Sequence, residues 1–225
     1  MQISWLGHAC FVLVSNQGTR IVTDPFDADM YKGHLNYQPI DISADIVTIS
    51  HSTHDDHNYA RGVRDRRLVK TKAKETVIDD VKIRGVESYH DQSSGRERGP
   101  NTIFVFDIDG LVVVHLGDLG HVLEQMHVAA IGPKVDVLLC PVGGAVTVDL
   151  IEAGQTIDKL NPRIVIPMHF KTPDCRIGFD DVEPFLANRE RVKRLPYTVA
   201  INPADLPEQM EVWVMDYRKE KDPVP

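Results

Sequence analysis

The sequence contains few cysteines and no long apolar run. Its three cysteines, Cys10, Cys140 and Cys175, are an odd number at wide spacing, which is not the pattern of a disulfide framework. Cys10 and Cys140 stand in apolar runs, so we expect buried thiols. No apolar stretch approaches the roughly 20 residues that span a bilayer, and no charged leader precedes an apolar segment near Met1. We therefore expect a soluble, cytoplasmic protein with no membrane segment.

Positive charge is also in short supply. The chain has 25 Lys and Arg against 33 Asp and Glu, which gives a formal net charge of −8. Binding nucleic acid without regard to its sequence requires clustered cations along the phosphate backbone, so nucleic acid is not an expected partner. A small-molecule substrate remains open, including an anionic one, because a few local cations can still form an anion site. A homo-oligomer also remains open.

The length and composition are those of one globular domain. The chain has 225 residues, 42% of them hydrophobic, which is enough to bury a core. It contains no internal repeat, low-complexity tract or long linker. We predict a single domain over residues 1–217 and a polar tail over residues 218–225.

Short apolar and β-branched runs predict strands in the first half of the chain. We expect these strands at residues 3–6, 10–15, 20–23, 45–50, 76–78, 81–86, 102–108 and 111–116. The pair Asp109-Gly110 is the strongest hairpin signal, and a long loop covers residues 25–43. The second half predicts helices at residues 123–131, 148–160 and 181–190 and strands at 135–139, 163–167 and 211–217. This order fits an α/β or an α+β domain, and periodicity alone does not choose between them.

A loop rich in histidine and aspartate follows the fourth predicted strand. The segment from Ser50 to Asn58 reads SHSTHDDHN and carries three histidines and two aspartates within residues 51–57. Imidazole and carboxylate are the usual ligands of zinc and of harder first-row metals. Packing so many such groups at the end of an apolar strand is costly without a cation or solvent. The alternative is a polar surface loop, but strand-end loops are where α/β proteins place their sites.

Three further candidate ligands each follow a predicted strand. His90 follows the strand that starts at residue 81, Asp118 follows the strand that ends at residue 116, and His169 follows residues 163–167. A single histidine or aspartate at a strand end is more often solvated or hydrogen-bonded. Three of them, each after its own strand, favour a metal site.

The order of these motifs resembles the metallo-β-lactamase superfamily, in the branch of proteins similar to ascorbate-6-phosphate lactonase. The motifs run in the family's order and cover residues 3–217: WLGHACF at 5–11, TDPF at 23–26, the loop at 51–57, HDQSSGRERGPN at 90–101, HLGDLGH at 115–121, PVGG at 141–144 and IPMHF at 166–170. The resemblance implies an α/β fold of the αββα type, in which two β-sheets face each other with helices outside. It places the metals where the strand-end loops meet.

The resemblance also implies a set of metal ligands. The positions that match the family are His54, Asp56, His57, His90, Asp118 and His169. Asp118 matches the carboxylate that bridges two metals. The position of the family's first histidine holds Ser52, and the nearest imidazole is His51, one residue earlier. A shift of one residue turns an extended side chain to the opposite face, and a bulge can turn it back.

We therefore predict a bulge or kink around Ser52-Thr53 that turns His51 toward the metals. His51 would then complete the first position together with His54 and His90. In the competing arrangement His51 points away and a single metal occupies the second position, which Asp56, His57, Asp118 and His169 form.

The expected activity follows from the metal. The resemblance implies one or two divalent ions, with zinc expected and manganese or iron as alternatives. Metal binding lowers the pKa of water toward roughly 7, which supplies hydroxide at neutral pH. We expect this hydroxide to attack a small ester, lactone or phosphoester, with Asp56 as the catalytic residue that orients it. The alternative function is a non-catalytic metal-binding or sensor protein of the same fold.

Several residues around the predicted ligands are candidates for supporting roles. Arg96 and Arg98 follow His90 closely, and a guanidinium is suited to bind carboxylate or phosphate, so we predict a substrate-anion contact. A solvated loop or an ion pair with Glu97 is the structural alternative. His8 and His115 are either supports for the ligands or plain buried histidines. A nuclease of the same superfamily fits the acidic charge poorly.

Overall fold

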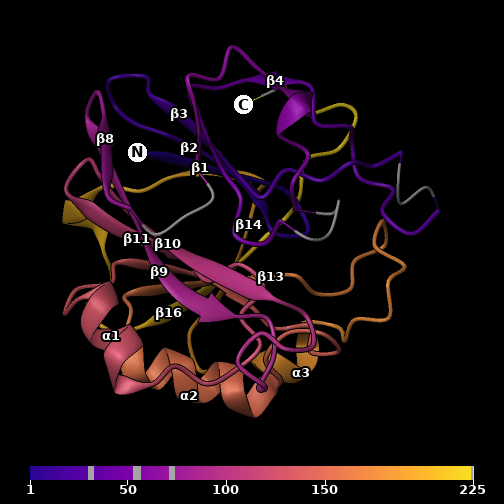
Figure 1. The fold of residues 1–225 in the computed structure, drawn as a ribbon, viewed down its shortest axis with the longest axis vertical. Coiled ribbons are helices and arrows are strands. Elements are labelled where there is room, and N and C mark those ends of the chain that lie inside the picture. The colour runs from indigo at the N-terminus through magenta and orange to yellow at the C-terminus, as the bar shows by residue number, and fades with distance from the viewer. Residues whose placement is uncertain (30–32, 53–56, 71–73, 224) are drawn as a thin grey trace.

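The computed structural model describes residues 1–225 except residues 30–32, 53–56, 71–73 and 224. Two β-sheets lie one over the other, and the three α-helices of the described residues lie outside the larger sheet (Figure 1). The first sheet has the order β15-β1-β2-β3-β5-β7. Its strands are β1 (Gln2–Gly7), β2 (Cys10–Val14), β3 (Arg20–Thr23), β5 (Ile46–Thr48), β7 (Leu68–Lys70) and β15 (Thr198–Ala200).

The second sheet is the larger one and has the order β14-β16-β13-β12-β11-β10-β9-β8. Its strands are β8 (Thr76–Ile78), β9 (Val81–Tyr89), β10 (Pro100–Ile108), β11 (Leu111–His115), β12 (Val137–Pro141), β13 (Ile164–Met168), β14 (Val192–Leu195) and β16 (Glu211–Met215). The strands β8 to β11 pair antiparallel, whereas β11, β12, β13 and β16 pair parallel. The Asp109-Gly110 hairpin is confirmed, because Ile108 pairs with Leu111 and both turn residues have positive φ.

The helices connect the parallel strands and cover the outer face of the larger sheet. They are α1 (Gln125–Ile131), α2 (Leu150–Leu160) and α3 (Glu183–Leu186). The Asp149 carboxylate accepts hydrogen bonds from two backbone N–H groups of the first turn of α2, and the helix ends at Asn161 in the left-handed region. On the other side of the molecule lie the short pair β4 (Ile42–Ser43) and β6 (Val63–Arg64) and the 3-10 turn Ala60–Gly62 (Figure 1).

The core lies in and between the two sheets. All five residues of β12 and all five of β13 are buried, because the helices cover one face of these strands and the first sheet covers the other. The largest fully buried side chains include Trp5, Phe11 and Phe104. All three cysteines are buried, which confirms the prediction for Cys10 and Cys140. Among the described residues, no helix has the length and apolar character needed to cross a membrane.

The sequence prediction is wrong for the helix at residues 181–190. Only Glu183–Leu186 are helical, with Pro184 in the first turn and no side-chain hydrogen bond from Val182 to cap the start. The chain then turns toward β14 and leaves no room for further helical turns. The strands β14 and β15 are not predicted because their residues are charged or half-buried and lack an apolar alternation.

Candidate metal centre

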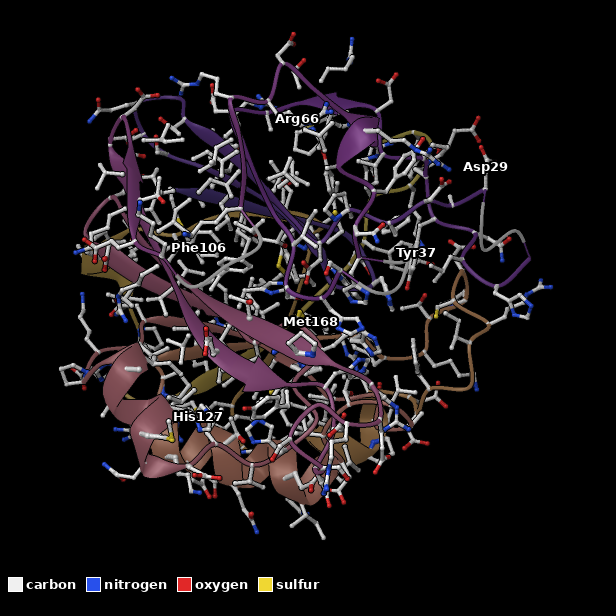
Figure 2. All side chains as sticks on the ribbon, in the orientation of Figure 1. Asp29, Tyr37, Arg66, Phe106, His127 and Met168 are labelled. Carbon is white, nitrogen blue, oxygen red and sulfur yellow. The ribbon has the colours of Figure 1, made fainter. Side chains whose placement is uncertain are left out.

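The topology brings the predicted ligands to one edge of the sandwich. His51 follows the end of β5, His90 follows β9, Asp118 follows β11 and His169 follows β13. Met168, the last residue of β13, lies near the middle of the molecule between the two sheets (Figure 2). Because β11, β12 and β13 are parallel, their carboxyl ends meet at the same edge. His54 and Asp56 lie outside the described residues.

Asp118 stands at the centre of the described part of the site. Its Oδ1 atom lies 2.9 Å from Nε2 of His57 and 3.4 Å from Nε2 of His169, whereas its Oδ2 atom lies 3.7 Å from Nε2 of His90. One carboxylate oxygen thus faces His57 and His169, and the other faces His90. Burial alone would raise the pKa of Asp118, but His57 and His169 hold it well below its usual range. Asp118 is therefore ionised at neutral pH, and its two oxygens can serve two neighbouring cations.

His51 lies beside His90, with the two ring centroids 4.6 Å apart. Nδ1 of His51 donates a hydrogen bond to the carbonyl oxygen of Pro100 at 2.9 Å, which leaves Nε2 of His51 with the lone pair. This Nε2 atom lies 3.4 Å from Nδ1 of His90. His90 presents Nδ1 to His51 but Nε2 to Asp118, so the 3.4 Å contact is a hydrogen bond between the two rings. A metal held by both imidazoles and by Asp118 requires one of the two rings to turn.

The protonation state of His90 also suits a ligand. Burial lowers the pKa of the His90 imidazole to about 4, although the Asp118 carboxylate opposes this effect. The ring is neutral at pH 7, which is the form that binds metals. The predicted bulge around Ser52-Thr53 falls partly outside the described residues, so it stays a prediction.

His8, which the sequence indicates as a candidate support for the ligands, lies in the same cluster. It lies in the turn between β1 and β2 and is 1% exposed. A donor atom from each of His8, His57 and His169 lies within 4.8 Å of the others. Together with Asp118, these residues give a buried set of nitrogen and oxygen donors that fits a zinc ion or another first-row divalent metal.

His115 supports the site and is not placed as a ligand. Its Nε2 atom donates to the carbonyl oxygen of Ala9 at 2.9 Å, and its Nδ1 atom accepts a hydrogen bond from the backbone N–H of Gly117 at 3.1 Å. Both ring nitrogens are thus engaged with the backbone. Burial lowers the pKa of His115, so the ring is neutral and fixed in one tautomer. It joins the loop that carries Asp118 to the turn that carries His8.

Two further polar residues hold the ligand loops, and the sequence analysis assigned no role to either. The Asp24 carboxylate accepts hydrogen bonds from the backbone N–H and the hydroxyl of Ser50, at 2.7 and 2.5 Å, directly before His51. Oδ1 of Asn101 accepts the backbone N–H of Asp118 at 3.0 Å, and its amide nitrogen donates to the carbonyl oxygen of Leu116 at 2.9 Å. Asp24 belongs to the TDPF motif and Asn101 ends the HDQSSGRERGPN motif, so both lie in segments that resemble the family.

Two glycines allow the ligand loops to approach each other. A Cβ atom at Gly120 would lie 2.2 Å from the carbonyl carbon of His90, and one at Gly143 would lie 2.1 Å from the carbonyl oxygen of His169. Contacts this short are not found between a real Cβ atom and a backbone atom. Gly120 and Gly143 are therefore required where they pack directly behind two of the predicted ligands.

The loop after His90 is fixed by one carboxylate. Asp91 accepts hydrogen bonds from four backbone N–H groups, those of Ser93, Gly95, Glu97 and Arg98. Burial would raise the pKa of Asp91, but these four donors lower it to about 2. Arg96 is exposed and donates to the carbonyl oxygen of Ser93. Arg98 is half-buried, and its charge lies close enough to His90 to lower the pKa of that imidazole. The structure thus separates the two arginines.

Comparison with known proteins agrees with this fold and with a metal-dependent hydrolase. A model of a family described as "Beta-lactamase superfamily domain" matches residues 2–169. A metal-dependent hydrolase from Pyrococcus furiosus is 30% identical over 201 residues, which cover 76% of this chain and 85% of that protein. A metal-dependent hydrolase from Thermoplasma acidophilum is 28% identical over 222 residues, covering 88% of this chain and 92% of that protein.

Solved structures show the same similarity. A protein from Thermotoga maritima, described as a Zn-dependent hydrolase of the metallo-β-lactamase superfamily, is 36% identical with a TM-score of 0.78. The match covers 96% of this chain and 99% of that one. Igni18, a metallo hydrolase from Ignicoccus hospitalis, has a TM-score of 0.62 at 21% identity and shows the shared fold. The predicted superfamily and sandwich are confirmed, whereas the likeness to ascorbate-6-phosphate lactonase stays a prediction.

Proposed function

Because the chain belongs to the β-lactamase superfamily and is a metal-dependent hydrolase, we propose that it hydrolyses a small anionic ester, lactone or phosphoester. The observation that carries the proposal is the placement of Asp118. Its ionised carboxylate lies among the imidazoles of His57, His90 and His169, all of them buried. A buried carboxylate among imidazoles is a donor set for a divalent cation.

The ligands divide into two positions that share Asp118. His57 and His169 face one of its oxygens, and His90 faces the other. His51 lies beside His90 and adds an imidazole there. We propose zinc as the metal because nitrogen donors outnumber oxygen donors, with manganese and iron as alternatives. When bound, the metal supplies a water of lowered pKa and polarises the substrate oxygen.

The chain's own residues then supply binding and orientation. Asp118 and the imidazoles hold the reacting centre in a buried environment, where electrostatic interactions are stronger than in water. Arg98, held beside His90 by the loop that Asp91 fixes, supplies the cation for a carboxylate or phosphate of the substrate. For Asp56 we keep the proposed role of orienting the attacking water. An odd number of widely spaced cysteines fits a reducing compartment, and we propose the cytoplasm.

A comparison of Arg98→Ala with Arg96→Ala tests the substrate proposal. The metal-loaded protein is assayed on a panel of carboxylate esters, lactones and phosphodiesters, each with an anionic and a neutral member. We expect Arg98→Ala to raise KM for the anionic members about tenfold, the equivalent of about 1.4 kcal/mol of binding. Arg96→Ala, the matched control, should leave KM unchanged. Stoichiometric metal without turnover on any member would instead favour the non-catalytic alternative.

A further inference from the structure

We propose that His8 is a metal ligand and that it adds a third imidazole to the second position, beside those of His57 and His169 and the Asp118 carboxylate. The inference rests on the metal site of the proposed function and extends its ligand set. The superfamily motif supplies no ligand from the turn between the first two strands. The assignment therefore comes from the geometry of this chain.

The backbone of His8 is tied directly to the backbone of His169. The carbonyl oxygen of His8 accepts a hydrogen bond from the backbone N–H of His169 at 3.2 Å and another from Nε1 of Trp5 at 3.0 Å. The first bond joins the turn between β1 and β2 to the end of β13, and the second ties the turn to β1. Residue 7 must be glycine for this turn, because its φ is +112° and a Cβ atom there would lie 2.5 Å from the ring of Tyr37.

The ring of His8 lies among the other imidazoles. Its centroid is 4.4 Å from that of His169 and 4.7 Å from that of His57. The donor atoms of the three rings lie within 4.8 Å of one another. Two donors on one tetrahedral zinc ion are about 3.3 Å apart, so the rings must move closer together when the ion binds.

Phe179 holds this arrangement from behind. Its ring stacks on that of His8, with the ring centroids 5.7 Å apart and an interplanar angle of 10°. It also lies against the ring of His169, with the centroids 4.3 Å apart. Phe179 is itself buried, so it keeps bulk water from this side of both imidazoles.

His115, in the same region, is a buried histidine with a structural role. Its two nitrogens are engaged with the backbone of Ala9 and Gly117, which fixes the ring away from the metal. A donor atom of His8 lies instead within 4.8 Å of donor atoms of His57 and His169. The difference assigns His115 to support and His8 to binding.

The test compares His8→Asn with His34→Asn. His8 has a φ of +54°, a conformation that asparagine adopts readily, so the variant removes the imidazole without a new backbone cost. His34 is exposed in a different loop and serves as the matched control. Zn²⁺ affinity is measured by competition with a chromophoric chelator, and the Co²⁺-loaded proteins are compared by visible absorption. Circular dichroism of the metal-free variants checks folding, and His8→Gly serves as a second variant that needs no side-chain accommodation.

We expect His8→Asn and His8→Gly to weaken the binding of one Zn²⁺ ion at least tenfold and to change the Co²⁺ spectrum. His34→Asn should do neither. His169→Ala separates the two proposals. If it loses metal while both His8 variants keep the wild-type affinity and spectrum, His8 is not a ligand and the proposed metal centre stands. If none of these variants loses metal, both proposals are wrong.

Discussion

The two ends of the larger sheet each bury an aspartate, but the two aspartates have different partners. Asp136 precedes β12 at its amino end, where its carboxylate accepts the backbone N–H of Val112 at 2.7 Å and pairs with Lys134 at 2.8 Å. Asp118 follows β11 at its carboxyl end and faces three imidazoles. Both residues are 2% exposed. Burial therefore does not distinguish structure from function here, whereas the partners do.

The two ends of the larger sheet also differ in the residues that line the space beside them. A groove of about 880 Å³ lies at the amino end, lined by Lys134, Asp136, Arg163 and several prolines. Its charges are matched within the protein, since Lys134 pairs with Asp136 and Arg163 donates to the carbonyl oxygens of Pro207 and Glu208. The groove at the amino end is therefore large, but the described residues that line it do not point a set of ligand atoms at one centre. Chemistry concentrates at the other end, where the parallel strands finish.

The largest effect is expected from replacing Asp118, the carboxylate that both metal positions share. We expect Asp118→Asn to lower the rate at least about a thousandfold and to reduce bound metal, because a neutral amide replaces the anion that serves both positions. Asp136→Asn should cost about 1–3 kcal/mol of stability and leave the metal content unchanged. Turnover and elemental analysis measure both. Equal metal loss in the two variants would show that the two ends do not differ as proposed.

A smaller but still large effect is expected from a single imidazole of the site. His169→Ala should remove most of the metal from the second position, because His169 is one of only a few donors there. His127 is the matched control, since it caps α1 by accepting the backbone N–H of Glu124 and lies on the helical side of the molecule (Figure 2). His127→Ala should lower the thermal midpoint and keep the metal. Unchanged metal content in His169→Ala would contradict the assignment.

Acid should destabilise the metal end in the metal-free protein. The pKa of His90 is lowered to about 4 by burial, and burial also lowers the pKa of His115, so both are neutral in the folded state at pH 6. Between about pH 6.5 and pH 4 the unfolded chain binds protons that the folded chain does not. The free energy of unfolding therefore decreases as the pH is lowered through this range. Urea unfolding at pH 7 and pH 5 measures this loss. His90→Gln should flatten the dependence, and an equally steep curve for that variant would exclude His90 as a source.

Local patterns were sufficient to predict much of the fold. Asp109-Gly110 makes its hairpin because both residues tolerate positive φ, and that preference is local. His90, Asp118 and His169 meet because each follows a strand whose carboxyl end lies at the same edge.

The sequence indicated His8 and His115 as candidate supports of the site, but the partners of these supports could not be predicted because they depend on long-range contacts. His8 joins the site through a hydrogen bond between residues 161 positions apart, and Asn101 supports Asp118 through a side chain whose partners lie on other strands. No period or spacing in the sequence encodes either contact. The edge strands β14 and β15 were missed for a related reason, since their pairing with β16 and β1 supplies the order that their own residues do not.

The smallest effect concerns the loop beside the site. Asp91 holds Arg98 in place through hydrogen bonds to the loop backbone, so Asp91→Ala should loosen the loop without touching a ligand. We expect KM for an anionic substrate to rise about threefold and kcat to change little, because the cost is the entropy of ordering one cation. Glu97→Gln is the control, since Glu97 is exposed and only accepts from the Ser93 hydroxyl. The pKa of Asp91 is about 2, so the effect should persist at every pH above about 4. A drop in metal content instead would mean that the loop positions His90 rather than Arg98.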